Sequence, residues 1–332
     1  MRTSLLVLLA CISAVCQASD IVDAEFVVND ERIHDFIEKG SKVEVLAGDF
    51  GWAEGPVWAP GLDALLFSDV AADKIYRWDT SNGLSVFLSP SGHPPDDLPR
   101  SWRGSNGLAI DAEGRLVLAQ QGHRTLARMR APLDDPAPDF ESLATQFDGN
   151  SINSPNDLVV HRSGDIYFTD PPYGLSGFEN SPDIELDFFG VFRLSPAGEL
   201  SVVADDLQKP NGIALSPDQS TLYVSNSEAG SERIIAIQLD ENGGRSQSSI
   251  LFDASNLDEN GAGSTDGMTV HPSGCLFVSI PGGLAVLSPA GELLGKISLG
   301  QVTNMAVDTS SSYLYITTPN QLLRISIGSG TP

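Results

Sequence analysis

The chain repeats one short unit six times, and this repeat limits the possible folds more than any other feature. Each unit has an apolar strand, a turn of Asp, Ser, Pro or Gly, and a second strand, as in NDLVVHRSGDIYFTD and NGIALSPDQSTLYVS. A third apolar strand often follows, for example KIYRWD or RIIAIQL. Short alternating strands separated by turn residues predict an all-β protein. The units begin at Glu54, Asn106, Asn156, Asn211, Asp266 and Thr303.

The spacing of the units predicts a propeller. Successive starting residues lie 52, 50, 55, 55 and 37 positions apart, and repeats of this length with about four strands each are typical of propeller blades. The last unit has room for only three strands. We therefore expect KVEVLAG at residues 42–48 to supply the outer strand of blade six. The predicted fold is one six-bladed β-propeller domain over residues 42–328, preceded by a lead-in segment at 19–41.

The first residue of every unit carries a side-chain oxygen. In a propeller these residues form a ring around the central channel, because the innermost strand of each blade lines it. Asn-Gly and Asp-Gly also form ordinary turns, but Glu54-Gly-Pro is not a favoured hairpin turn, and six oxygen-bearing residues in register favour a functional ring. Carboxylates and amide carbonyls are ligands for a hard cation such as Ca²⁺. The ring has no Cys or His, which argues against zinc.

Charge and the N-terminus restrict the partners and the location. The chain has 44 acidic and 19 basic residues, a formal charge of −25, which disfavours binding to nucleic acid or anionic membranes. Residues 1–18 have the layout of a secretory signal peptide cleaved after Ala18, so we expect export to a periplasm or to the outside, without membrane insertion. Cleavage leaves one cysteine, Cys275, which we expect to be a buried small residue. Nothing in the sequence specifies an oligomeric state.

An ordered set of motifs gives the chain a family resemblance. WAEGPVW, SNGLAIDAEGRLVLAQQGHRTLARM, SPNDLVV, IYFTDPPYG, ELDFFGVFRLSPAGEL, KPNGIALSPD and STDGMTVHPSGCLFVS follow one another along residues 48–327. Together they resemble the SMP-30/gluconolactonase family, and within it the bacterial gluconolactonase-like branch. The resemblance implies a six-bladed, calcium-dependent hydrolase that acts on small molecules, namely sugar lactones or related esters. Whether Zn²⁺ or Mn²⁺ replaces Ca²⁺ stays open.

The resemblance also implies residue roles. The family's four metal ligands fall on Glu54, Asn156, Asn211 and Asp266, which are four of the six ring positions. Asn106 and His123 become substrate-side residues. Asp157 is also expected to bind substrate, as a neighbour of Asn156 that adjusts the site or its channel. Some members carry an Arg two residues before the position of Asn156; here that residue is Ser154, so their substrate preference is not carried over.

Asp266 is the catalytic candidate that the resemblance supplies. It would accept the proton of the attacking water, while the metal stabilises the charge that develops on the carbonyl oxygen. A carboxylate bound to a dication is a weaker base, so either its free oxygen accepts the proton or the metal acidifies the water. His123 is a second candidate for proton transfer.

Two other functions remain open from the sequence. One is hydrolysis of aryl esters or phosphotriesters on the same propeller. The other is a non-catalytic exported platform whose Ca²⁺ is structural. Loops at 89–104 and 176–188 could shape the pocket, with Arg100 and Arg103 as possible cationic contacts to an acidic substrate.

Overall fold

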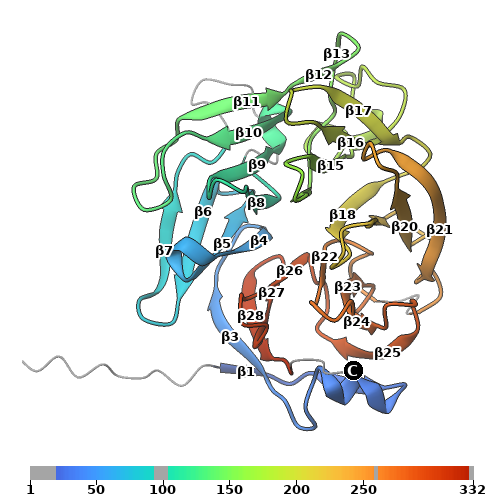
Figure 1. Cartoon of the computed structure of the whole chain (residues 1–332). Coiled ribbons are helices and arrows are strands. Elements are labelled where there is room, and N and C mark those ends of the chain that lie inside the picture. Colours follow the sequence, from blue (N-terminus) through green and yellow to red (C-terminus); the bar gives the residue numbers. More distant parts are fainter. Residues whose placement is uncertain (1–19, 93–103, 258–260, 329–332) are drawn as a thin grey trace, which may run out of the picture.

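The computed structural model describes residues 20–92, 104–257 and 261–328. Six antiparallel sheets surround a central axis, and Figure 1 views the ring with the first blade in blue and the last in red. The only helices in the described part are short 3₁₀ turns, and none of them is long and apolar enough to cross a bilayer. The predicted six-bladed propeller is confirmed.

Blades one to four are meanders of four strands, and the sheets of blades five and six have five strands each. Within each repeat the innermost strand comes first in the chain. Inner strands of blades that follow one another in the chain contact each other, and the inner strand of blade six contacts that of blade one. The blades therefore follow one another around the axis in the same order as along the chain. The strands of blades one to three are β4 (Ala53–Ala59), β5 (Ala64–Asp69), β6 (Lys74–Asp79), β7 (Gly83–Leu88), β8 (Leu108–Ile110), β9 (Leu116–Gln120), β10 (Thr125–Met129), β11 (Phe140–Ala144), β14 (Leu158–Val160), β15 (Ile166–Asp170), β16 (Gly190–Leu194) and β17 (Leu200–Ala204).

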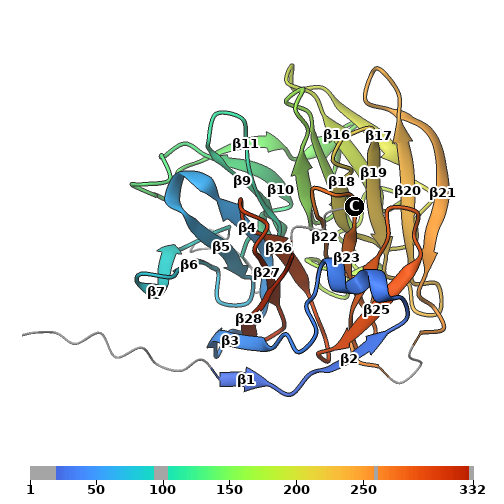
Figure 2. The same ribbon diagram turned by 60° about the horizontal axis from the view of Figure 1, so that its bottom comes forward.

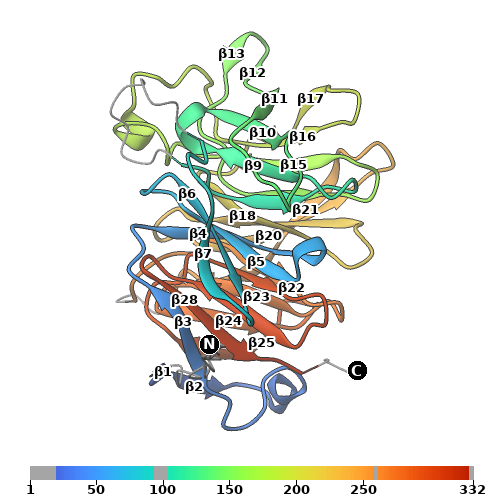
Figure 3. The ribbon, with the colours of Figure 1, turned by 90° about the vertical axis from the view of Figure 1, so that its left-hand side faces the viewer.

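The second half of the ring repeats this pattern. Its strands are β18 (Pro210–Leu215), β19 (Thr221–Asn226), β20 (Arg233–Leu239), β21 (Arg245–Asp253), β22 (Met268–Val270), β23 (Leu276–Ile280), β24 (Gly283–Leu287), β25 (Leu293–Ser298), β26 (Asn304–Val307), β27 (Tyr313–Thr317) and β28 (Gln321–Ser326). A small hairpin of β12 (Gln146–Phe147) and β13 (Asn150–Ser151) links blades two and three, and it projects from one end of the molecule in Figure 3.

The start of the chain closes the ring. Strand β3 (Val43–Gly48) pairs antiparallel with β28 and supplies the fourth strand of blade six, as predicted. It is not the outermost strand, because β1 (Asp20–Val22) pairs with its free edge. Strand β2 (Glu25–Val28) likewise extends blade five by pairing with β25. Figure 2 shows these N-terminal strands lying along the two last blades, so the lead-in segment is part of the propeller.

Buried apolar side chains hold neighbouring blades together. In the described residues they form six clusters, one at each interface between blades. The cluster between blades five and six includes Ile33 and Ile37, from and just after the 3₁₀ turn η1 (Glu31–Asp35), and also Cys275, which is fully buried as expected. Because burying one such aliphatic side chain contributes about 2 kcal/mol, every interface is strongly stabilised.

Four glycines follow the ring residues for a reason other than turn formation. Gly107, Gly212 and Gly267 donate their backbone N–H groups to the carbonyl of the ring residue in the next blade, at 2.7, 3.1 and 2.7 Å. A β-carbon on Gly212 would lie 2.3 Å from the Asp266 carbonyl oxygen. On Gly55, whose φ is +53°, it would lie 2.1 Å from the Asn106 carbonyl oxygen. Only glycine allows the inner strands to approach this closely.

This close approach makes a stability prediction. We expect Gly212→Ala to lower the free energy of unfolding by about 3 kcal/mol, because the added methyl group overlaps the backbone of blade five. Chemical denaturation measures the change. Gly61→Ala is the matched control, since a β-carbon there meets no atom within 4 Å, and its unfolding curve should match the wild type. Equal stability of Gly212→Ala and Gly61→Ala would contradict this role for the glycine.

Candidate metal and active site

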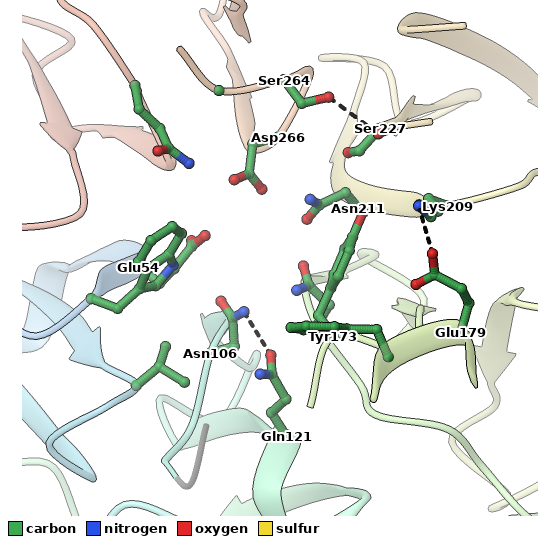
Figure 4. A pocket seen from close by; sticks show the side chains of 16 residues that line it. Glu54, Asn106, Gln121, Tyr173, Glu179, Lys209, Asn211, Ser227, Ser264 and Asp266 are labelled. Atoms are coloured by element: carbon green, nitrogen blue, oxygen red, sulfur yellow. Dashed lines mark hydrogen bonds and ion pairs between the residues drawn. The ribbon is translucent and has the colours of Figure 1, made fainter. Parts of the chain in front are cut away.

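A cavity of about 520 Å³ opens at the end of the channel where the inner strands begin. Figure 4 shows polar side chains pointing into it from several blades. Five of the six predicted ring residues line it: Glu54, Asn106, Asn156, Asn211 and Asp266. The structure therefore brings together all four residues that the resemblance assigns to the metal. The other lining residues are Trp52, Val70, Gln121, Tyr173, Phe178, Glu179, Lys209, Ser227, Gly263, Ser264 and Gln301.

The sixth ring residue, Thr303, does not line the cavity. Its hydroxyl group donates to the Ala53 carbonyl at 2.6 Å and lies 2.9 Å from the hydroxyl of Thr317. It therefore joins blade six to blade one. The expectation that all six positions face the channel mouth is wrong at this position, because the threonine hydroxyl bonds across the closing interface.

The two carboxylates of the ring share a buried, acidic environment. Glu54 is 3% exposed, and its Oε2 accepts a hydrogen bond from the N–H of Gly55 at 2.9 Å. Burial raises the pKa of Glu54 to about 8, and the nearby Asp157 adds to the shift. Asp266 is partly accessible from the cavity. Burial raises its pKa well above the usual range, and the charges of Glu54 and Asp157 raise it further.

The three asparagines of the site are almost fully buried. Asn106, Asn156 and Asn211 are 4%, 4% and 6% exposed. The Nδ2 of Asn106 donates to the Oε1 of Gln121 at 2.9 Å, and its Oδ1 is buried without a hydrogen-bond partner. A buried amide oxygen without a hydrogen-bond partner destabilises the folded protein.

This donor set fits a hard cation. Two carboxylates that repel each other, and amide oxygens able to act as ligands, are the chemistry that Ca²⁺ takes. Among the described residues there is no group of three or more His, Cys, Asp and Glu side chains suited to a metal. A cation here would therefore depend on the amides as well as on Glu54 and Asp266.

Asp157 lies beneath the site rather than in it. It does not line the cavity described above, and instead lines a second cavity of about 340 Å³ together with residues such as Pro56, Met268 and Asn304. Its carboxylate accepts from the N–H groups of Leu158 at 2.9 Å and Ile213 at 3.3 Å. Burial raises its pKa to about 6. This position does not favour direct contact between Asp157 and a substrate bound in the first cavity.

Asp157 and Asn304 both line the second cavity and face each other across the channel. They occupy the position that is Gly55, Gly107, Gly212 or Gly267 in the other blades, and blades three and six lie opposite each other in a ring of six. The Nδ2 of Asn304 donates to the Oδ2 of Asp157 at 3.3 Å across the channel. The two residues of the amide–acid pair therefore face different cavities: Asn156 lines the first, and Asp157 lines the second.

His123, which was also predicted to lie beside the substrate, does not line the first cavity. It ends the 3₁₀ turn η3 (Gln121–His123), and the cavity is lined by Gln121 at the start of that turn. Sequence reasoning missed Gln121 because an amide in a short turn carries little signal. Its bond to Asn106 places it in the site, whereas His123 accepts from the Thr125 hydroxyl with its backbone carbonyl.

Ser154 orients the loop that brings Tyr173 to the cavity. Its hydroxyl donates to the Pro171 carbonyl at 2.6 Å and accepts from the Gly174 N–H at 2.8 Å. Tyr173 lies between these two contacts and lines the site. Ser154 therefore fixes the position of an aromatic side chain in the wall of the cavity. Burial raises the pKa of Tyr173, which keeps its hydroxyl protonated.

Asp170 stabilises the same loop from inside. Its Oδ2 accepts from the Asn153 N–H at 2.6 Å and from the Asn153 side chain at 3.1 Å. It is fully buried and does not line the cavity, so it caps this turn instead of contacting a ligand in the cavity. Arg100 and Arg103 lie outside the described residues, as does the predicted signal peptide.

Known proteins match this fold over most of their length. A gluconolactonase of Zymomonas mobilis is 38% identical over 302 residues, which cover 89% of this chain and 83% of that protein. A pentonolactonase of Haloferax volcanii is 25% identical over 80% of each chain. The solved structure of a gluconolactonase from Xanthomonas campestris superimposes with a TM-score of 0.79 and 30% identity, covering 94% of this chain and 99% of that one.

The family model named SMP-30/Gluconolactonase/LRE-like region matches residues 52–320. That range begins at Trp52, beside the first ring residue, and ends in blade six, so it includes every residue of the cavity described above. On this match, and on the identity to the Zymomonas protein, the chain belongs to the SMP-30/gluconolactonase/LRE-like family.

Proposed function

We propose that the protein hydrolyses sugar lactones with the help of a bound divalent cation, most simply Ca²⁺. The observation that carries this proposal is the ring itself, in which two carboxylates and three amides from five different blades line one cavity. The names of relatives support the reaction class, since they include a gluconolactonase and a pentonolactonase. A cavity of about 520 Å³ has room for a sugar-sized molecule.

Four residues would hold the cation: Glu54, Asn156, Asn211 and Asp266. When bound, the cation would polarise the lactone carbonyl and stabilise the negative charge that develops on its oxygen. The protein's part is to supply oxygen ligands on rigid inner strands. Backbone N–H groups of Gly107 and Gly212 connect these strands to the next blade, so the ligand positions are fixed before substrate arrives.

Asp266 is the residue that we assign to proton transfer. The oxygen of a water molecule would bond to the carbonyl carbon while one proton of the water moves to the Asp266 carboxylate. The bond between that carbon and the ring oxygen then breaks, and the ring oxygen takes up the proton to become a hydroxyl group. Burial and the charge of Glu54 raise the pKa of Asp266, whereas a bound cation would lower it, so the two effects oppose each other.

Other residues would bind and orient the substrate. Asn106 and Gln121 form a hydrogen-bonded pair whose remaining polar atoms can bind substrate oxygen atoms. Tyr173 and Trp52 line the cavity and offer aromatic faces to the C–H groups of a sugar ring. We also propose that the protein is exported, on the signal-peptide pattern of residues 1–18.

A substrate panel tests the proposed reaction. In pH-stat assays with Ca²⁺ present, we expect D-glucono-1,5-lactone and five-membered sugar lactones to be hydrolysed at least ~10²-fold faster than phenyl acetate or paraoxon, measured as kcat/KM. Because lactone hydrolysis releases a proton, the titrant added gives the rate directly, after subtraction of the spontaneous reaction. Faster turnover of the aryl ester or the phosphotriester would replace the lactonase proposal. No turnover of any compound would favour a binding role.

A further inference from the structure

Lys209 is the only cationic side chain among the described residues that line the cavity. It immediately precedes β18 and lies two residues before Asn211. Its backbone is fixed on both sides, because its N–H donates to the Oδ1 of Asn226 at 3.0 Å and its carbonyl accepts from the N–H of Ser227 at 2.9 Å. The side chain therefore starts from a rigid position at the wall of the site.

Two carboxylates hold the ammonium group at this wall. The Nζ of Lys209 lies 3.1 Å from the Oε2 of Glu228 and 3.6 Å from the Oε1 of Glu179. Figure 4 shows the pair of Lys209 and Glu179 beside Asn211 and Tyr173. The Lys209 side chain is 23% exposed, against 49% for Glu179 and 37% for Glu228. Partly exposed ion pairs of this kind contribute little to stability, and this one places an ammonium group at the cavity wall.

The charge balance indicates which ligands the group can bind. One ammonium between two carboxylates carries a net charge of −1. A carboxylate of a substrate placed beside this group would be repelled. A hydroxyl group fits better, because it can accept from one of the three donors of the ammonium and donate to either carboxylate. Hydroxyl groups of Ser227 and Ser264 lie on the same side of the cavity in Figure 4.

We propose that Lys209, held between Glu179 and Glu228, is a specificity-determining residue that binds a hydroxyl group of the substrate. It selects neutral, polyhydroxylated lactones over lactones without hydroxyl groups. This inference rests on the proposed lactonase function and deepens it. Lys209 takes no part in proton transfer. It holds the lactone in position over the carboxylates and amides that line the channel.

The test compares two lactones in one variant. For Lys209→Met, we expect KM for D-glucono-1,5-lactone to rise about tenfold or more, because a hydrogen bond to a charged donor is lost. We expect kcat to stay within about threefold, and kcat/KM for δ-valerolactone, which has no hydroxyl groups, to stay within about twofold. Lys209→Arg should restore part of the affinity. Lys42→Met, an exposed lysine of the N-terminal segment, is the matched control.

Two outcomes would overturn the inference: an unchanged KM for the sugar lactone, or an equal loss for both lactones. Lys209→Gln replaces the methionine variant if that variant melts early, since glutamine keeps a donor but removes the charge and should give an intermediate KM. A binding measurement tests the role of Lys209 independently of the proposed reaction. If the wild type hydrolyses neither lactone, calorimetry with D-glucono-1,5-lactam gives the answer: about tenfold weaker binding by Lys209→Met supports the hydroxyl site. Equal binding, or none by the wild type, rejects it.

Discussion

Asp266→Asn should lose about a thousandfold in kcat on D-glucono-1,5-lactone, even at saturating Ca²⁺. The amide keeps the shape and one oxygen of the side chain but cannot accept the proton of the attacking water. Saturating cation is needed because the loss of one negative charge also weakens cation binding. The measurement is pH-stat turnover, with cation affinity of the same variant determined by calorimetry.

Asp63→Asn is the matched control for this substitution. Asp63 is exposed, lies beyond the other end of β4 from the ring residue, and has a positive φ of 47° that asparagine tolerates. Its turnover should equal that of the wild type. If Asp266→Asn retains turnover within about tenfold of the wild type at full cation occupancy, Asp266 is not the base.

Removal of divalent cations should abolish turnover and make thermal stability depend strongly on pH. Burial raises the pKa of Glu54 to about 8 and that of Asp157 to about 6, and raises that of Asp266 as well. Between pH 4.5 and pH 8 the folded protein thus binds protons that the unfolded chain has released, and its stability falls as pH rises. We expect Tm of the EDTA-treated protein to drop by on the order of 5 °C from pH 5 to pH 8.

A bound cation should reverse this trend. It compensates the ionised carboxylates, so Ca²⁺ should raise Tm more at pH 8 than at pH 5 and should restore turnover. Glu54→Gln should flatten the pH dependence of the metal-free protein, whereas Glu199→Gln, at an exposed carboxylate, should leave it unchanged. A pH-independent Tm, or full turnover after chelation, would contradict a cation site at Glu54 and Asp266.

The repeat in the sequence was enough to predict both the blades and most of the ring. Strands of one meander recur in the same register, so Glu54, Asn106, Asn156, Asn211 and Asp266 could be superimposed before their positions in space were known. Closure by residues 42–48 followed from counting strands. The added strands β1 and β2 could not be found in this way, because short edge strands outside the repeat have no counterpart in other blades.

Contacts between blades were harder to predict than the blades themselves. The glycines after the ring residues match turn patterns in the sequence, yet they allow one inner strand to approach the next. Thr303 shares the ring position but bonds to Ala53, and Asp157 points toward Asn304 instead of the substrate cavity. Each of these contacts depends on a partner in another blade, and a single sequence does not reveal which partner that is.

Residues on loops were missed for a related reason. Gln121, Tyr173 and Lys209 all line the cavity, but none of them is one of the six ring residues. Tyr173 had one local signal, the Pro-Pro-Tyr-Gly turn, and Lys209 had only its position beside Pro210-Asn211. Loop side chains reach the site through hydrogen bonds such as those of Ser154, which become visible only when the loop is folded.

The pairing of β3 with β28 also bears on how the chain assembles. Gly48 pairs with Gln321, so the edge of β28 stays open until the two ends of the chain meet. Joining partners so distant in sequence is slow, and an open strand edge accepts any matching strand. Residues 20–48 of one molecule could complete the ring of another by the same hydrogen bonds, forming a swapped dimer. At high protein concentration, closure of the ring within one molecule would then compete with exchange of residues 20–48 between two molecules.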